Sequence, residues 1–321
     1  MIQRVKTYYR RFCKLIPDLP WWNLLFNKVQ RRVKSGAGCS IRAPRTLNDV
    51  ILNSKVYGRD QRYTILANKF YANRFVASRI GEEFVPKIYH HYWGVDEICK
   101  SSMVDLDQFV VKSTHDSSGA LLVESMASVP VIDAKNTMGF ATGFVEDVDR
   151  SVCENNFLKI KKFLNHNTSR SHFYHTREWQ YKDQVPSILL EQLLLYKERP
   201  PNDIKVHCRF GEPFLFYCSV DRTGRNYRKL YDRNWRPIAG GWGLKGDEEK
   251  FLGDEIEQPN WFSDINDICS ALARDIPYVR LDFYDLGCRP VFGEYTFHHG
   301  SGWEVIWPEA FSREIVKNWK L

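Results

Sequence analysis

The sequence contains no apolar run that approaches the roughly 20 residues needed to cross a bilayer. Its N-terminus also lacks the apolar segment of a secretory signal peptide, so we expect a cytoplasmic protein. Eight cysteines are present, but none forms a C-x-x-C pair or another zinc-ligand spacing. Reduced, buried thiols are therefore expected instead of a zinc site. The Gly-x₄-Gly-Lys spacing is absent too, which excludes a P-loop.

The sequence has no excess charge outside its first 34 residues. Residues 1–34 hold nine Lys or Arg and one acid, Asp18, whereas the rest hold 37 basic and 38 acidic side chains. Because a nucleic-acid-binding body would carry basic stripes throughout, nucleic acid is not an expected partner.

Residues 1–34 mix their cations with aromatic and aliphatic side chains, and Pro17 and Pro20 divide them into two predicted short helices. This mixture suits helices at an anionic membrane surface, which would place the protein peripherally on the inner face of the cytoplasmic membrane. A basic helix pair packed on the protein body is the alternative.

Strand-like and helical patterns are interleaved in the remaining sequence. Paired apolar runs predict three hairpins, at 107–112 with 120–123, at 204–210 with 214–220, and at 277–285 with 291–297. Apolar spacing predicts helices over 61–80, 151–166 and 263–275. Strand pairs with interleaved helices indicate an α+β fold and not a doubly wound parallel sheet.

The third hairpin carries polar residues in an alternating pattern. Arg280 and Asp282 share one strand face, and Glu294 and Thr296 share a face of the return strand. If the apolar faces both point to the core, two carboxylates and a hydroxyl converge in a site suited to Mg²⁺. Arg280 beside them could hold a phosphate or a developing oxyanion. A cross-strand ion pair on a solvated face is the alternative.

The first hairpin offers a candidate phosphate clamp. Lys112 closes its first strand and precedes a small polar loop that ends at Gly119. Backbone N–H groups of such a loop can cradle phosphates while the Lys adds a point charge. A solvated Lys before a turn is the commoner alternative. Gly300-Ser301-Gly302 is a second amide-rich turn of this kind.

The order of these segments resembles the TupA-like ATP-grasp proteins that are encoded with bacterial surface-polysaccharide genes. Further matching segments are KFYANRFVASRIG (69–81), REWQY (177–181), ILLEQLL (188–194) and VRLDFYDLGCRPVFGEYTFHHGSG (279–302). The resemblance implies an ATP-grasp fold, in which two α+β lobes clasp ATP and Mg²⁺, with a helical N-terminal extension. The expected regions are a basic aromatic segment at 1–60, a helical region at 61–103, and a catalytic region at 104–321 with lobes at about 104–190 and 191–321.

The resemblance also implies residue roles. The expected catalytic residues are Arg280 and Lys112. The expected ATP-binding residues are Lys112, Ser117, Ser118, Gly119, Glu191, Gln192, Leu193, Asp203 and Lys205. The expected metal ligands are Asp282, Glu294 and Thr296, where Thr296 stands in place of a common Asn. The expected substrate-binding residues are Arg177, Arg222, Arg228 and Ser301.

The reaction implied by the resemblance is ATP-dependent carboxylate–amine ligation through an acyl phosphate. It would join an amino acid or amine to a carbohydrate or acidic glycan, such as a surface polysaccharide or its precursor. A sugar or glycan kinase of the same fold would use the same residues, so the sequence leaves that alternative open. A non-catalytic nucleotide-binding scaffold is the third possibility.

Overall fold

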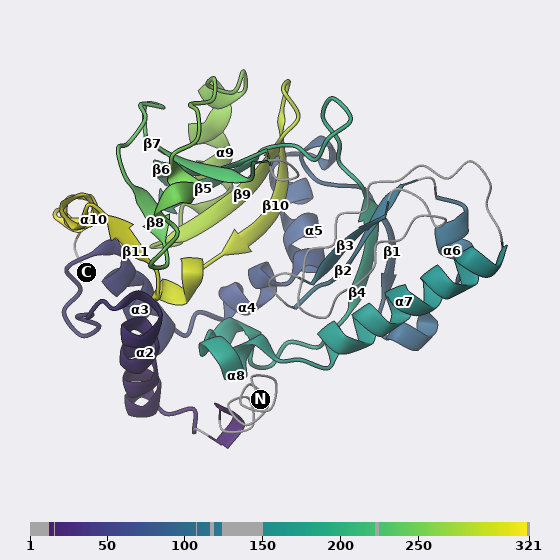
Figure 1. Cartoon of the computed structure of the whole chain (residues 1–321), viewed down its shortest axis with the longest axis horizontal. Helices are drawn as coiled ribbons and strands as arrows, with labels where there is room; N and C mark the ends of the chain where they lie inside the picture. The colour runs from purple at the N-terminus through teal and green to yellow at the C-terminus, as the bar shows by residue number, and fades with distance from the viewer. Residues whose placement is uncertain are drawn as a thin grey trace.

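Two antiparallel sheets form the centre of the molecule, with helices around them (Figure 1). The structure is a computed structural model and describes residues 13–15, 17–106, 108–115, 119–123, 150–221 and 225–319. This arrangement is the α+β architecture that the interleaved strand and helix patterns predict. No helix within these ranges is both long enough and apolar enough to span a membrane.

The first sheet has four strands in the order β1-β4-β2-β3, all paired antiparallel. The strands are β1 (Ile88–Tyr92), β2 (Phe109–Ser113), β3 (Ala120–Val123) and β4 (Ile188–Gln192). The predicted first hairpin is confirmed as β2 and β3. One face packs on the long helix α7 (Arg150–Thr168) through a buried cluster that includes Phe109, Val111 and Leu190. Alternation along β2 therefore turns Val110 and Lys112 toward the opposite face.

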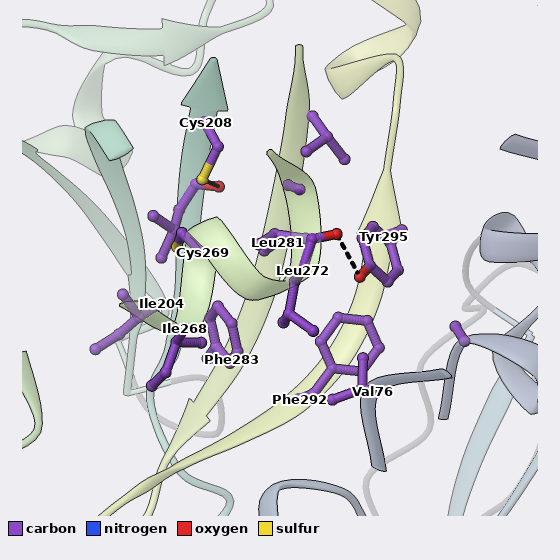
Figure 2. Close-up of a cluster of buried hydrophobic side chains, with 14 of the residues drawn as sticks. Val76, Ile204, Cys208, Ile268, Cys269, Leu272, Leu281, Phe283, Phe292 and Tyr295 are labelled. Atoms are coloured by element: carbon purple, nitrogen blue, oxygen red, sulfur yellow. Dashed lines mark hydrogen bonds between the residues drawn. The ribbon is translucent and has the colours of Figure 1, made fainter. Parts of the chain in front are cut away.

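The second sheet has five strands in the order β10-β9-β5-β6-β7. The strands are β5 (Asp203–Arg209), β6 (Glu212–Val220), β7 (Tyr227–Asp232), β9 (Val279–Asp285) and β10 (Pro290–Thr296). They confirm the second and third predicted hairpins. One face packs on α9 (Ile265–Ala273), and Tyr295 closes this core by donating a hydrogen bond from its hydroxyl to the Leu272 carbonyl at 3.1 Å (Figure 2). The other face carries charged side chains on β5 and β9, because these strands alternate buried apolar residues with charged ones.

The prediction of one continuous helix over 61–80 is wrong. The segment forms two helices, α4 (Gln61–Ala67) and α5 (Lys69–Ile80), which are separated at Asn68. The Asn68 side chain accepts a hydrogen bond from the Phe70 N–H and so caps α5, while the Lys69 N–H donates to the Thr114 carbonyl. An Asn is a strong N-cap, and this local bond outweighs the apolar periodicity that runs across it.

The N-terminal part and the C-terminal part pack together beside the second sheet (Figure 1). They comprise α2 (Pro20–Ser35), α3 (Leu47–Tyr57), β8 (Gly241–Gly243), β11 (Val305–Trp307) and α10 (Glu309–Val316). Helix α2 begins at Pro20, which confirms the expected break there. The fixed φ angle of proline favours the first position of a helix. The described residues also form two short helices, α6 (Ser101–Val104) and α8 (His172–Thr176).

Candidate active site

A cleft of about 310 Å³ lies between the face of the first sheet that carries Lys112 and the charged part of the second sheet. Both sheets and the loops at their ends contribute to its walls. The residues predicted for the site that line it are Lys112, Gly119, Glu191, Gln192, Leu193, Asp203, Lys205, Arg280, Asp282 and Glu294. The structure thus brings together residues from three distant segments, and the volume is within the range typical of small-molecule sites.

The wall from the four-stranded sheet carries a buried ion pair. Lys112 on β2 and Glu191 on β4 project to the same face, and the Lys112 Nζ contacts the Glu191 Oε1. Both side chains are largely buried. A buried pair holds each partner in one orientation, because losing either contact would leave a charge without compensation. Lys112 is therefore fixed at the cleft by Glu191.

The opposite wall depends on a β-bulge in the third hairpin. The register passes from Phe292 opposite Phe283 to Glu294 opposite Asp282, so Gly293 is the extra residue. Without the bulge, Glu294 would share the core face with Phe292. The inserted glycine instead turns Glu294 to the face of Asp282. Simple alternation within each strand predicted both ends of this hairpin correctly, but it does not reveal the shift between them.

Arg280 and Asp282 form a two-pronged contact on this wall. The Arg280 Nε donates to Asp282 Oδ1 and its Nη2 donates to Oδ2, both at 2.6 Å, and Nη2 also lies 3.3 Å from Glu294 Oε1. Burial alone would lower the pKa of the Arg280 guanidinium, but the Asp282 charge and hydrogen bonds outweigh burial and raise it. Arg280 is therefore a permanent cation at the floor of the cleft.

Lys205 joins the two acids of the neighbouring strands. Its Nζ contacts the Asp203 carboxylate on β5 and lies 3.1 Å from Asp282 Oδ2 on β9. Strand alternation puts Asp203 and Lys205 on the same face, and the register sets Lys205 directly opposite Asp282. The cleft floor thus alternates anions and cations at close range, so it offers cations that can bind a phosphate and carboxylates that can bind a metal ion.

Lys69 lines the cleft and was not among the residues predicted for the site. It is the first residue of α5. Burial alone would raise the pKa of Glu294, but Lys69 is foremost among the cations that outweigh burial and lower it, followed by Arg280 and Lys205. Its only signal in the sequence was membership of the matching segment 69–81, which carried no role.

The backbone of Gln192 has a role within the sheet. Its N–H donates to the Lys87 carbonyl at 2.9 Å. The Gln192 N–H is therefore used within the sheet, and the assignment of Gln192 and Leu193 to ATP binding stays a prediction. Leu193, Leu194 and Pro200 continue the wall beyond it and give this end of the cleft an apolar surface, which suits a flat heterocycle.

Three predicted substrate-binding residues lie apart from the residues that line the cleft. Arg177 is buried, and its Nη2 donates to the Cys13 carbonyl at 2.5 Å, so it anchors the N-terminal segment. The Ser301 hydroxyl donates to the buried Glu178 at 2.7 Å. Arg228 lies on β7, where its Nη1 donates to the Asn226 Oδ1 at 2.7 Å. All three side chains are basic or polar, but their hydrogen bonds to these protein groups are structural contacts.

The other predicted residues are the loop residues and Thr296. Ser117, Ser118 and Arg222 lie outside the described residues. Thr296 is not among the cleft-lining residues, and its hydroxyl donates to Glu294 Oε1 at 3.1 Å. Gly119 stands where a side chain would not fit, because a Cβ would come within 2.2 Å of the Ser113 Oγ.

The candidate magnesium ligands of the cleft are the carboxylates of Asp282 and Glu294. In the described part of the chain, no group of three or more His, Cys, Asp or Glu side chains is arranged to hold a metal ion. Magnesium commonly binds through one or two carboxylates plus substrate phosphates, so Asp282 and Glu294 are sufficient in number. Asp282 Oδ2 accepts from both Arg280 Nη2 and Lys205 Nζ, whereas Oδ1 accepts from Arg280 Nε alone among these cations, so Oδ1 keeps a second lone pair for a metal ion. The residues therefore fit magnesium delivered with a nucleotide.

The chain has distant similarity to solved ATP-grasp structures. D-alanine–D-alanine ligase from Bacillus anthracis shares 11% identity over 73% of this chain and 57% of that chain, with a TM-score of 0.36. The ATP-grasp ligase PsnB, complexed with a minimal precursor, shares 10% identity over 78% and 60%, with a TM-score of 0.37. PsnB complexed with the precursor peptide PsnA2 and AMPPNP shares 8% identity over 78% and 57%, with a TM-score of 0.35. This chain thus spans less than two thirds of each of them.

A comparison with curated proteins finds no match. The sequence pattern of the TupA-like ATPgrasp family matches residues 49–319, which include every described residue of the cleft. The match covers most of the chain and agrees with the two-sheet arrangement and the charged cleft between the sheets. This chain therefore belongs to the TupA-like ATP-grasp family and has the ATP-grasp fold.

Proposed function

We propose that this protein is an ATP-dependent carboxylate–amine ligase that acts through an acyl phosphate. The observation that carries the proposal is the convergence of Lys112, Lys205, Arg280, Asp282 and Glu294 on one cleft. Cations and acids on opposite walls can bind a triphosphate between them. The family and the ATP-grasp fold support the ligase class, while the residues supply the chemical roles.

The chain's own residues would divide the work between binding and charge stabilisation. Lys112 would contact the phosphates from one wall, and Asp282 and Glu294 would hold Mg²⁺ at the other. When bound, the metal would neutralise the charge on the β- and γ-phosphates. An acid substrate placed in line with the γ-phosphate would become an acyl phosphate with release of ADP. Attack by an amine would then form the amide and release phosphate.

Arg280 is the residue we assign to the developing oxyanion. Its Nε and Nη2 are held by the carboxylates of Asp282 and Glu294, which orients the guanidinium. We assign the remaining Nη1 as the donor to this oxyanion, and one well-placed donor of this kind stabilises a transition state by about 3 kcal/mol. The charge on Arg280 persists across all relevant pH values because its pKa is raised.

The resemblance to proteins encoded with surface-polysaccharide genes supports a proposal for the substrate class. We propose that the acid is a uronic acid or another acidic sugar of a bacterial surface glycan or its precursor, and that the amine is an amino acid or a simple amine. The proposed domains are an N-terminal helical segment, a helical region at 61–103 and a two-lobed catalytic region at 104–321. Strand β1 pairs with β4, so the middle region contributes to the first sheet.

Hydroxylamine trapping tests the reaction. Purified protein is incubated with Mg²⁺, ATP, a panel of uronic acids and hydroxylamine, which intercepts an acyl phosphate as a stable hydroxamate. Ligase chemistry predicts hydroxamate and ADP in equal amounts, both dependent on the acid. ADP with a stable phosphosugar and no hydroxamate would identify the kinase alternative. A chain that binds ATP but never releases ADP with any acceptor would instead support the scaffold alternative.

A further inference from the structure

Helix α2 (Pro20–Ser35) has one face that is anchored to the protein body. Its buried residues are Asn23, Phe26, Asn27 and Arg31. The Trp303 Nε1 donates to Asn27 Oδ1 at 2.9 Å, and the Arg31 Nη1 donates to the Gly302 and Glu304 carbonyls at 2.7 and 2.8 Å. These long-range contacts fix the rotation of the helix, so which residues face outward is determined by the fold.

The opposite face exposes a stripe of large apolar side chains. Trp21 is 55% exposed, Leu25 47%, Val29 49% and Val33 75%. Because residues four apart lie above one another on a helix, these four form one continuous line along α2. Helix α2 stands at the edge of the molecule (Figure 1), and the residues that it buries lie on its other face. A contiguous apolar stripe of this kind indicates an interaction surface.

The charges beside the stripe select an anionic partner. Lys28 and Arg32 are exposed on its flank, and α2 contains no acidic residue. The sequence of residues 1–34 holds nine cations and one acid, while the rest of the chain is almost neutral. A second copy of the chain would bring these cations against each other, which opposes a dimer through this face. Apolar side chains beside cations are instead the composition of helices that lie in a lipid headgroup layer.

We propose that α2 lies flat on the surface of an anionic phospholipid bilayer and holds the protein there as a peripheral membrane protein. The stripe from Trp21 to Val33 enters the headgroup layer, while Lys28 and Arg32 contact lipid phosphates. Arg31 and Asn27 bind the segment that follows β10, so α2 is firmly joined to the protein body. The cleft would therefore keep a constant orientation to the membrane. The inference is independent of the proposed ligase activity.

Vesicle co-sedimentation of the full chain tests the proposal. The probe is sucrose-loaded vesicles of equimolar phosphatidylglycerol and phosphatidylcholine at about 0.1 M salt, compared with pure phosphatidylcholine vesicles. We expect binding to the anionic vesicles and at least tenfold weaker binding to the neutral ones. The double variant Leu25→Glu/Val29→Glu should lose at least tenfold in affinity. Lys28→Gln/Arg32→Gln should lose a comparable factor, since each cation near the surface contributes about fivefold.

Matched controls separate this surface from general effects. Leu252→Glu changes an apolar residue that is 77% exposed and lies far from α2 along the chain, so it should bind like the unaltered protein. Val33→Glu provides a second α2 variant at its most exposed apolar position, in case the double variant unfolds in a circular dichroism melt. The proposal is overturned if the unaltered protein does not sediment with anionic vesicles, or if the folded α2 variants bind as well as Leu252→Glu. A dimer that the α2 variants dissociate, without vesicle binding, would overturn it in favour of self-association.

Discussion

The two carboxylates proposed to hold magnesium differ in what they do for the folded protein. Asp282 is buried and accepts hydrogen bonds from Arg280 and Lys205. Glu294 is 34% exposed at its side chain and lies at 3.3 Å from the Arg280 Nη2. Removing the charge of Asp282 therefore disturbs a buried network, whereas removing that of Glu294 mainly removes a ligand.

Glu294→Gln should abolish Mg²⁺-dependent ADP formation, by about 100-fold or more, while changing the free energy of unfolding by less than about 1 kcal/mol. Asp282→Asn should also abolish turnover but should cost about 2–3 kcal/mol in stability, because it leaves buried Arg280 undercompensated. Initial rates and urea melts of both variants check these values. Near-normal rates in both folded variants would remove the metal assignment.

Residue-level patterns account for the charged walls but not for every member of the cleft. Alternation along β9 and β10 predicted that Arg280, Asp282 and Glu294 share a face, and the structure shows that they do. Lys69 was overlooked because it belongs to a helix terminus whose direction depends on the Asn68 break. A lone Lys at the start of an apolar pattern carries no signal for a distant sheet.

At the scale of elements, the turn after β10 is held in an unusual conformation. Gly300, Ser301 and Gly302 have φ values of 53°, 55° and 70°. Lys55 donates to the Ser301 carbonyl at 2.6 Å, and the Ser301 hydroxyl donates to Glu178. A Cβ at Gly300 would lie 2.3 Å from the Glu304 Cδ, so glycine makes room for that carboxyl group. Burial raises the pKa of Glu304 to about 7, although the Arg280 charge opposes the shift.

The raised pKa predicts how Glu304 affects stability. The folded state holds the proton more tightly than the unfolded state, whose Glu pKa is about 4.3. Proton binding by Glu304 therefore stabilises the folded state fully below about pH 4.3, and this stabilisation is lost as the pH rises through about 7. From pH 5 to pH 8, the free energy of unfolding of Glu304→Gln should rise relative to that of the unaltered protein by about 1–2 kcal/mol. This is less than the full pKa shift implies, because the Glu304 side chain is partly exposed to solvent.

Urea melts at several pH values measure this difference directly. Glu309→Gln is the control, since Glu309 is an exposed acid on α10 for which a surface pair with Arg313 is the main contact. Its stability difference should stay within about 0.5 kcal/mol over the same range. A constant difference for Glu304→Gln would show that the buried carboxyl titrates at its ordinary pKa.

At the scale of the whole molecule, the cleft exists only because two separate sheets face each other. One wall contributes Lys112 from the four-stranded sheet. The opposite wall contributes Lys205, Asp282 and Glu294, each from a different strand of the five-stranded sheet. A nucleotide with its metal would contact both walls and so stabilise the assembled state over the unfolded one.

A non-hydrolysable ATP analogue with Mg²⁺ should raise the thermal midpoint by about 5 °C or more at 100 times its dissociation constant, since this occupancy contributes about 2.7 kcal/mol. Differential scanning calorimetry measures the shift. Mg²⁺ alone, and the analogue with a chelator, should each give a much smaller change because the metal and the phosphates bind together. An equal shift without Mg²⁺ would indicate nucleotide binding that does not use Asp282 and Glu294.

The sequence by itself determined the three hairpins, the α+β class and the family, because strand alternation, turn residues and motif order are local properties. It also determined the segregation of charge into residues 1–34. Only the tertiary structure decided that Arg177 and Ser301 serve as structural contacts, since their partners Cys13 and Glu178 lie 164 and 123 positions away. It likewise decided that Lys69 enters the cleft. Contacts between distant segments depend on the packing of whole elements, and no local spacing encodes that packing.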